Sequence, residues 1–167
     1  MMLPENSRRV VVGVDGTART VAALRWAATE AMRRDAVLYA VHAWGNGLRP
    51  ASYAPVADHS TPAECAQRAA TRLAETVRAA FGATPPVPVR QVVDDRAVAP
   101  ALLDHARDAE LLVIATRAAA VDSRPGESGP GSTTLSCLRQ APCPVVVLPT
   151  DTVRVAPVGA GAGAAAR

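Results

Sequence analysis

The chain has 167 residues, of which 49% are hydrophobic and only 3% aromatic, and its formal net charge is +3. This length suits one domain and this composition suits a globular fold, so a multidomain assembly and a disordered chain are both excluded. All 18 basic residues are arginines, and without a lysine the chain cannot carry a Walker A phosphate loop, a protein-kinase site or Schiff-base chemistry.

The same composition constrains partners and location. No apolar run approaches the roughly 20 residues of a membrane helix, and the first residues lack the apolar stretch of a secretion signal, so we expect a cytoplasmic protein without membrane contact. The arginines are scattered and aromatics are few, which argues against a nucleic-acid partner. The cysteines lack C-x-x-C spacing and the histidines are dispersed, so neither a disulfide framework nor a metal site is expected. These residues are Cys65, Cys137, Cys143, His42, His59 and His105.

The first predicted unit is a strand, a tight turn and a helix. Residues 9–14 (RVVVGV) form a continuous β-branched block, which is typical of a strand buried on both faces. Asp15 and Gly16 end this block. From Thr17 onward apolar residues recur at helical spacing, at Val21, Leu24, Ala28 and Ala31.

The next unit has a long connection between its strand and its helix. Residues 37–42 predict a second buried strand, and the pattern then dissolves over residues 43–60, a length that is often functional in a compact domain. Thr61, with proline next and Glu64 three residues on, predicts a helix start with a capping box. That helix should stop in the segment 82–88, which is rich in glycine and proline.

Three more strands and two shorter helices complete the pattern. Strands are expected at 89–93, 111–115 and 145–148, with helices around 98–106 and 132–140. Buried strands that alternate with helices predict the α/β class, as a three-layer α/β/α sandwich around a five-stranded parallel sheet. Residues 1–149 would form this domain. The Ala/Gly-rich remainder, 150–167, is expected to be a disordered tail.

Taken together, the motifs of this chain resemble those of the universal stress protein family. The matching segments are VVVGVDGT (10–17), ALRWAATEA (23–31), VLYAVHAW (37–44), LLVIATR (111–117), GS (131–132) and APCPVVVLP (141–149). The resemblance implies a Rossmann-like sheet of order 3-2-1-4-5, as in adenine nucleotide α-hydrolase-like folds. It also implies a homodimer through the last strand, Val145 to Leu148, and a role in stress response or signalling.

A ligand site is expected where the strand order of such a sheet reverses. Asp15 and Ala115 end the first and fourth strands, which flank this switch point. In nucleotide-binding members of the family, the matching aspartate lies beside adenine and the second strand, around Val41, offers backbone contacts. Gly131 and Ser132 match the end of the segment that holds ribose and phosphates, and they open a helix whose free N–H groups suit an anion.

The nucleotide motif of the family, G-x2-G-x9-G-[S/T], is altered in this chain. Ala115 and Ala118 stand at its first two glycines, and twelve residues separate Ala118 from Gly131. Alanine there removes positive φ angles or close backbone approach. The inserted segment PGESGPGS (125–132) offers glycines for a new phosphate nest, but its glutamate would repel phosphate. We therefore expect weak or absent ATP binding, with ATP or AMP as the ligands to consider.

Each candidate residue also has a structural interpretation. Asp15 can satisfy the turn amides instead of contacting adenine, and Ser132 is expected mainly as a helix N-cap. Asp94 and Asp95 resemble a carboxylate pair, but a solvated turn is favoured because adjacent side chains point apart. Cys143, between two prolines, marks a rigid entry to the last strand.

Three functions remain open at this stage. The first is a non-enzymatic stress-protein dimer, and the second is an ATP or AMP sensor that uses Asp15 and the Gly131–Ser132 turn. The third is a hydrolase or transferase acting on ATP phosphates. The altered motif favours the first, and the chain offers no credible set of nucleophile, base and orienting group for the third.

Overall fold

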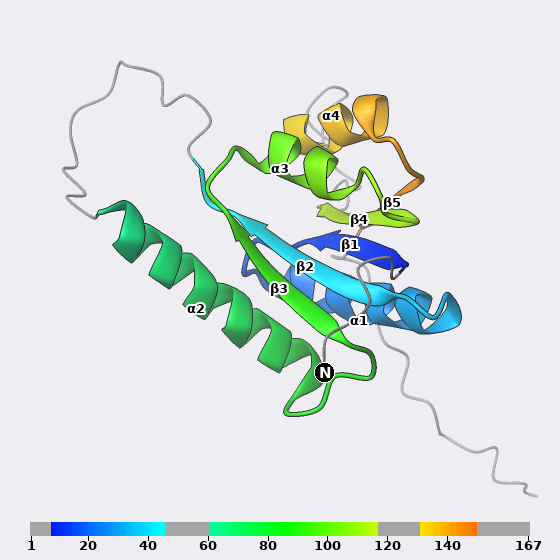
Figure 1. Ribbon diagram of the computed structural model, residues 1–167, viewed down its shortest axis with the longest axis horizontal. Coiled ribbons are helices and arrows are strands. Elements are labelled where there is room, and N and C mark those ends of the chain that lie inside the picture. The colour runs from blue at the N-terminus through cyan, green and yellow to red at the C-terminus, as the bar shows by residue number, and fades with distance from the viewer. Residues whose placement is uncertain (1–7, 46–60, 117–130, 150–167) are drawn as a thin grey trace, which may run out of the picture.

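The computed structural model describes residues 8–45, 61–116 and 131–149, and Figure 1 shows them as a twisted sheet between helices. The predicted disordered tail, 150–167, lies outside the described residues, as do residues 46–60 and 117–130. The elements are β1 (Arg9–Gly13), α1 (Ala18–Arg33), β2 (Val37–Ala43), α2 (Pro62–Phe81), β3 (Val89–Asp94), α3 (Val98–His105), β4 (Leu111–Thr116), α4 (Ser132–Gln140) and β5 (Val145–Pro149). Their order and approximate bounds agree with the predicted pattern.

The sheet has the predicted topology. Its five strands are parallel and lie in the order β3-β2-β1-β4-β5. The strand β1 occupies the centre, where Val12 is in register with Ala40 of β2 and with Val113 of β4. Chain order reverses between β1 and β4, so the switch point lies at the carboxyl ends of these two strands.

Two hydrophobic cores hold the helices against the sheet. The side chains of Val10 and Val12 face the core that α1 and α2 cover, while Val11 faces the core under α3 and α4 (Figure 1). All three valines are 0% exposed. A central strand with both faces buried needs apolar residues at successive positions, which explains the uninterrupted β-branched run.

The start of α2 follows the prediction from sequence in detail. Thr61 is the N-cap: its hydroxyl accepts a hydrogen bond from the Glu64 N–H at 3.3 Å, and the Glu64 carboxylate accepts one from the Thr61 N–H at 2.7 Å. The capping box thus satisfies two amides that the helix leaves free. Across the described residues, no helix is long and apolar enough to cross a membrane.

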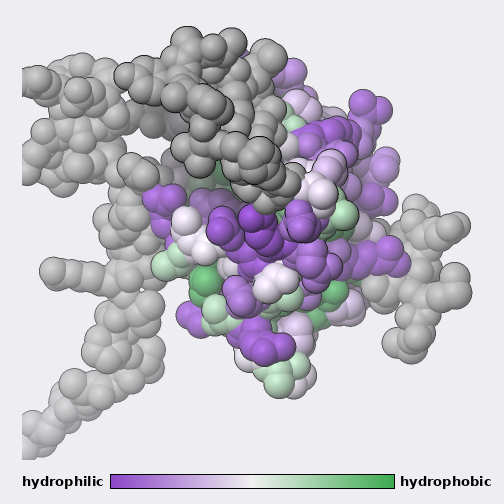
Figure 2. All heavy atoms as spheres, turned by 90° about the vertical axis from the view of Figure 1, so that its left-hand side faces the viewer, coloured by the Kyte–Doolittle hydropathy of each residue, from purple (hydrophilic) through white to green (hydrophobic). Residues whose placement is uncertain are grey.

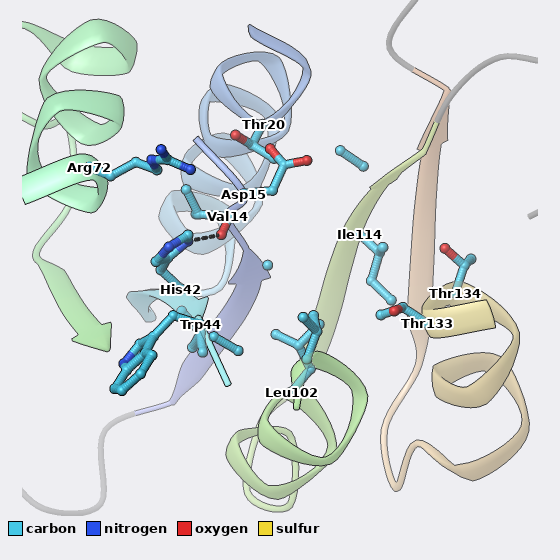
Figure 3. A pocket seen from close by; sticks show the side chains of 15 residues that line it. Val14, Asp15, Thr20, His42, Trp44, Arg72, Leu102, Ile114, Thr133 and Thr134 are labelled. Atoms are coloured by element: carbon cyan, nitrogen blue, oxygen red, sulfur yellow. Dashed lines mark hydrogen bonds between the residues drawn. The ribbon is translucent and has the colours of Figure 1, made fainter. Parts of the chain in front are cut away.

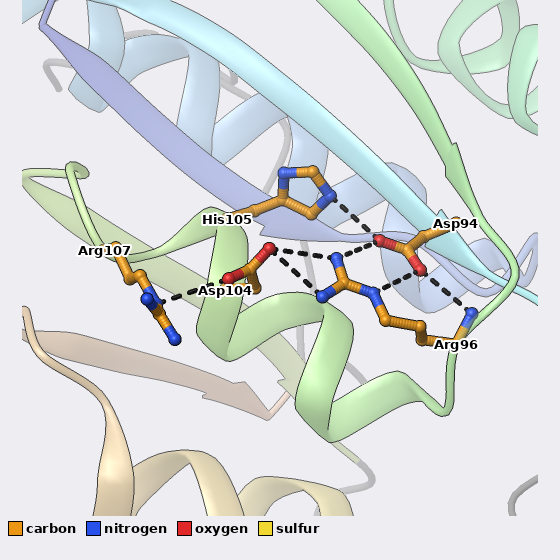
Figure 4. Close-up of polar contacts among 5 residues, drawn as sticks. All are labelled: Asp94, Arg96, Asp104, His105 and Arg107. Carbon is orange, nitrogen blue, oxygen red and sulfur yellow. Dashed lines mark hydrogen bonds and ion pairs between the residues drawn. The ribbon is translucent and has the colours of Figure 1, made fainter.

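The solvated turn predicted at Asp94 is wrong. Asp95 is exposed, but Asp94 is only 8% exposed and ends β3 inside a network of polar contacts (Figure 4). Its carboxylate accepts hydrogen bonds from the Arg96 backbone N–H and Nε, both at 2.9 Å, from Arg96 Nη2 at 2.7 Å, and lies 3.1 Å from His105 Nε2. The bonds from Arg96 hold the pKa of Asp94 well below its ordinary value, although burial alone would raise it.

This network ties β3 to its neighbours at the end of the sheet that carries the switch point. Arg96 also pairs with Asp104 of α3, with 3.1 Å between Nη1 and Oδ2. The Trp44 N–H donates to the carbonyl of Asp94 at 2.9 Å, and the Gly45 N–H donates to the carbonyl of Arg96 at 3.1 Å. A side chain at Gly45 would meet the carbonyl oxygen of Asp95, so glycine permits this close approach. Asp94 is therefore a structural residue.

Candidate functional site

A pocket of about 510 Å³ lies at the switch point (Figure 3). This volume falls within the range of small-molecule sites. The pocket is lined by the ends of β1, β2 and β4 and by side chains from all four helices. The lining residues are Gly13, Val14, Asp15, Thr20, Val41, His42, Ala43, Trp44, Arg72, Val98, Leu102, Ile114, Ala115, Thr133 and Thr134.

The structure brings together three of the five residues that the sequence suggested. Asp15, Val41 and Ala115 line the pocket, whereas Gly131 and Ser132 do not. The expectation that Ser132 caps α4 is wrong, because Gly131 occupies the N-cap and Ser132 is the first helical residue. The helix starts one residue earlier than the side-chain preference of serine suggests. As a result, the next two residues are the ones that reach the pocket.

Asp15 stabilises the turn that follows β1. Its Oδ1 accepts hydrogen bonds from the Thr17 N–H at 2.9 Å and from the Thr17 hydroxyl at 2.6 Å, and Arg19 Nη2 lies 3.6 Å from Oδ2. Partial burial would raise the pKa of Asp15, but the contacts from Thr17 and Arg19 outweigh it and lower that pKa. The carboxylate is therefore ionised at neutral pH and already carries the structural role expected as one alternative.

Backbone groups at the ends of β1 and β2 are also paired. The Val14 N–H donates to the carbonyl of Val41 at 2.8 Å. A ligand that approaches this carbonyl therefore meets an oxygen that already accepts a hydrogen bond. His42, which is 8% exposed, lies with Nδ1 2.6 Å from the carbonyl oxygen of Val14. Because that oxygen can only accept, Nδ1 is the donor. His42 thereby fixes the backbone immediately before Asp15.

Six polar or aromatic residues of the pocket were not predicted from sequence as site residues. They are Thr20, His42, Trp44, Arg72, Thr133 and Thr134. Arg72 comes from the middle of α2, and nothing in the helical pattern separates it from the other arginines of that helix. Its contribution depends on how α2 packs beside the turn after β1, where the structure places its stem over Gly16.

We expect Gly16→Ala to lower the free energy of unfolding by about 1 to 2 kcal/mol. Gly16 has φ of +81°, and a Cβ there would lie 2.5 Å from Cδ of Arg72. The substitution would strain the turn and displace the arginine together. Chemical denaturation is the measurement, with Gly82→Ala (φ of +68°, no atom within 4 Å of its Cβ position) as a control for backbone strain alone. Equal losses in both variants would contradict the predicted contact with Arg72.

The pocket offers little for catalysis. Its titratable lining residues are Asp15, His42 and Arg72, and the first two are engaged in holding the turn. In the part of the chain that the structure describes, no group of three or more His, Cys, Asp or Glu side chains could hold a metal ion. The geometry therefore defines a ligand pocket in a parallel α/β sandwich.

Comparison with known proteins places this fold in a family. The model of the universal stress protein family matches residues 6–149. A universal stress protein of Mycolicibacterium smegmatis (strain ATCC 700084 / mc(2)155) is 31% identical over 149 residues, which cover 85% of this chain and 48% of that protein. The chain therefore belongs to the universal stress protein family, and it spans about half the length of this relative.

Solved structures show the same fold at low sequence identity. UspA from Lactobacillus plantarum is 21% identical with a TM-score of 0.58, over 86% of this chain and 98% of that chain. A universal stress protein in complex with cAMP is 24% identical with a TM-score of 0.55, over 87% and 99%. One from Archaeoglobus fulgidus in complex with dAMP is 22% identical with a TM-score of 0.51, over 85% and 98%.

Proposed function

We propose that this chain is a non-enzymatic stress-response or signalling domain that acts as a homodimer in the cytoplasm and binds ATP weakly or not at all. One observation carries the proposal on ATP. Ala115 lines the pocket at the end of β4, where the nucleotide motif of the family has its first glycine. A methyl group there occupies space that a phosphate needs for close approach to the backbone.

The size of this effect follows from two altered positions. Ala115 is a strand residue without a positive φ, so its effect comes from the methyl group, which blocks close approach of a phosphate to the backbone. With a second alanine at 118 and a longer connection to Gly131, the losses add up to a binding defect of tens to hundreds of fold, at about 1.4 kcal/mol per decade.

The absence of a catalytic role is supported by the chemistry of the lining. The carboxylate of Asp15 and the imidazole of His42 make short contacts to the turn between β1 and α1. An acid or base in catalysis must be free to exchange a proton with a substrate. Cys143, which precedes β5, has a pKa raised by burial and so carries little thiolate.

The alternative is an adenine-nucleotide sensor that uses Asp15 and the Gly131–Ser132 turn. One observation favours it: Gly131 caps α4 without a side-chain hydrogen bond, and the first turn of that helix borders the pocket through Thr133 and Thr134. Amides at such a helix start attract anions. Two structural relatives are described in complex with cAMP or dAMP.

Calorimetric titration with ATP separates the two functions. We expect the wild type to bind ATP more weakly than micromolar, and the double variant Ala115→Gly/Ala118→Gly to bind about tenfold or more tightly than the wild type. Asp15→Ala should weaken whatever binding is found. AMP serves as the matched ligand, because it lacks the phosphates that the glycines would hold. Micromolar or tighter binding by the wild type would favour the sensor.

A further inference from the structure

Arg72 brings a positive charge to the pocket, and no group in the described part of the chain pairs with it. Its side chain lines the pocket from α2. Among the described residues it has neither a hydrogen bond nor an ion pair, since the one carboxylate in the lining, that of Asp15, is paired with Arg19. An arginine that lines a cavity without a counter-charge favours an anionic ligand, because the guanidinium presents five N–H donors in a fixed plane.

The stem of Arg72 is held against the protein. An ideal Cβ on Gly16 would lie 2.7 Å from Cγ and 2.5 Å from Cδ of Arg72, so the aliphatic part of the side chain rests directly on the turn after β1. Figure 3 shows the guanidinium next to Val14 and His42, at the rim of the pocket. Contact along the stem lowers the entropy that an arginine loses when it binds a ligand.

The pocket lining is apolar between the Arg72 guanidinium and the opposite wall, which α4 forms. Leu102 of α3 and Ile114 of β4 supply the apolar middle, and Leu102 is 2% exposed. On the far side Thr134, which as a whole residue is 4% exposed, lines the pocket. Its hydroxyl can donate or accept a hydrogen bond, so it offers a contact for a polar group on a ligand.

We propose that the pocket binds a small organic anion, with its negative group on the Arg72 guanidinium and its apolar body against Leu102 and Ile114. This inference rests on the proposed function, because it names the ligand class of the same pocket. It differs from the ATP site of the family in where the charge lies. The anion would sit at the α2 side of the pocket, away from Ala115 and the start of α4.

Two fluorescent probes test the proposal on the full chain. One is 8-anilinonaphthalene-1-sulfonate, an aromatic anion, and the other is N-phenyl-1-naphthylamine, which has the same ring system without the sulfonate. Each is titrated into the wild type and into Arg72→Gln, Arg72→Lys and Arg78→Gln. Arg78 is the matched control, since it is exposed on the same helix and does not line the pocket.

Arg72→Gln should weaken binding of the anionic probe about tenfold, the size expected for one charge-assisted contact. Binding of the neutral probe should stay unchanged, and Arg78→Gln should match the wild type for both probes. Arg72→Lys should retain most of the affinity for the anion. If Arg72→Gln does not fold by circular dichroism, Arg72→Met, which keeps the stem on Gly16, takes its place.

The proposal is overturned if Arg72→Gln and Arg78→Gln weaken the anionic probe equally, because net charge alone would then explain the effect. It is also overturned if Arg72→Gln weakens the binding of both probes to the same extent, since that shows a loss of pocket shape. Neither result bears on ATP, which is tested by the Ala115→Gly/Ala118→Gly variant. Failure of the anion site and failure of the proposed function are therefore distinguishable.

Discussion

Asp94→Ala should lower the free energy of unfolding by about 2 to 3 kcal/mol. Hydrogen bonds to a charged group contribute about 1.5 to 3 kcal/mol, and the substitution also leaves a donor without its acceptor. The 8% exposed carboxylate accepts three hydrogen bonds from Arg96 and contacts His105. Arg96 is 43% exposed at its side chain and also binds Asp104, which keeps the loss below that of a fully buried pair. Urea denaturation of both proteins measures the difference.

Asp95→Ala is the matched control for this substitution. Asp95 is the exposed neighbour, and its removal should change stability by less than about 0.5 kcal/mol. Equal effects of the two substitutions would contradict the structural role of Asp94.

The stabilisation by Asp94 also has a defined pH dependence. The folded protein depresses the pKa of Asp94 below the value of about 3.9 that an unfolded aspartate shows. The contribution is therefore complete above the unfolded pKa and is lost as pH falls toward the folded pKa. Between neutral pH and pH about 3, the stability of the wild type should fall more steeply than that of Asp94→Ala. Parallel curves would contradict this assignment.

The second large effect concerns assembly: we expect Val147→Pro to convert a homodimer into a monomer. Within the described residues β5 pairs with β4 alone, which leaves one edge open. The Leu112 N–H donates to the carbonyl of Pro144 at 3.0 Å, so alternation along the strand directs the backbone of Val145 and Val147 toward the open edge. Proline removes one N–H from that edge and leaves the pairing with β4 intact.

Light scattering at high micromolar concentration measures the mass of each protein. Val147→Ala is the control, because it keeps the N–H and should remain dimeric. A two-fold contact through β5 closes on itself and prevents open-ended association. If the wild type is a stable monomer, or if Val147→Pro remains a dimer, the edge of β5 is not the interface.

Most of the fold was predictable because its signals are local. The continuous valine run of β1 reports burial on both faces, and the capping box at Thr61 marks the start of α2 from neighbouring residues alone. The turn at Asp15, just after β1, also placed the switch point. These features need no knowledge of what lies across the fold.

The parts that sequence could not predict depend on tertiary contacts. Asp94 is buried because Arg96 and His105 close over it from α3 and the turn before it, and the adjacent-carboxylate pattern contains no sign of either partner. Arg72 and Thr134 reach the pocket through the packing of α2 and α4, which their own helical patterns do not specify. Contacts between residues that are distant in sequence are not visible in the spacing of residues along the chain.

The nucleotide content of the purified full chain tests the central claim most directly. Protein isolated at neutral pH without added nucleotide is denatured with acid, and the supernatant is separated by ion-exchange chromatography and quantified for ATP and AMP per chain. With Ala115 at the wall of the pocket, we predict no more than a trace of ATP. ATP at close to one molecule per chain would contradict the weak site proposed for this stress protein.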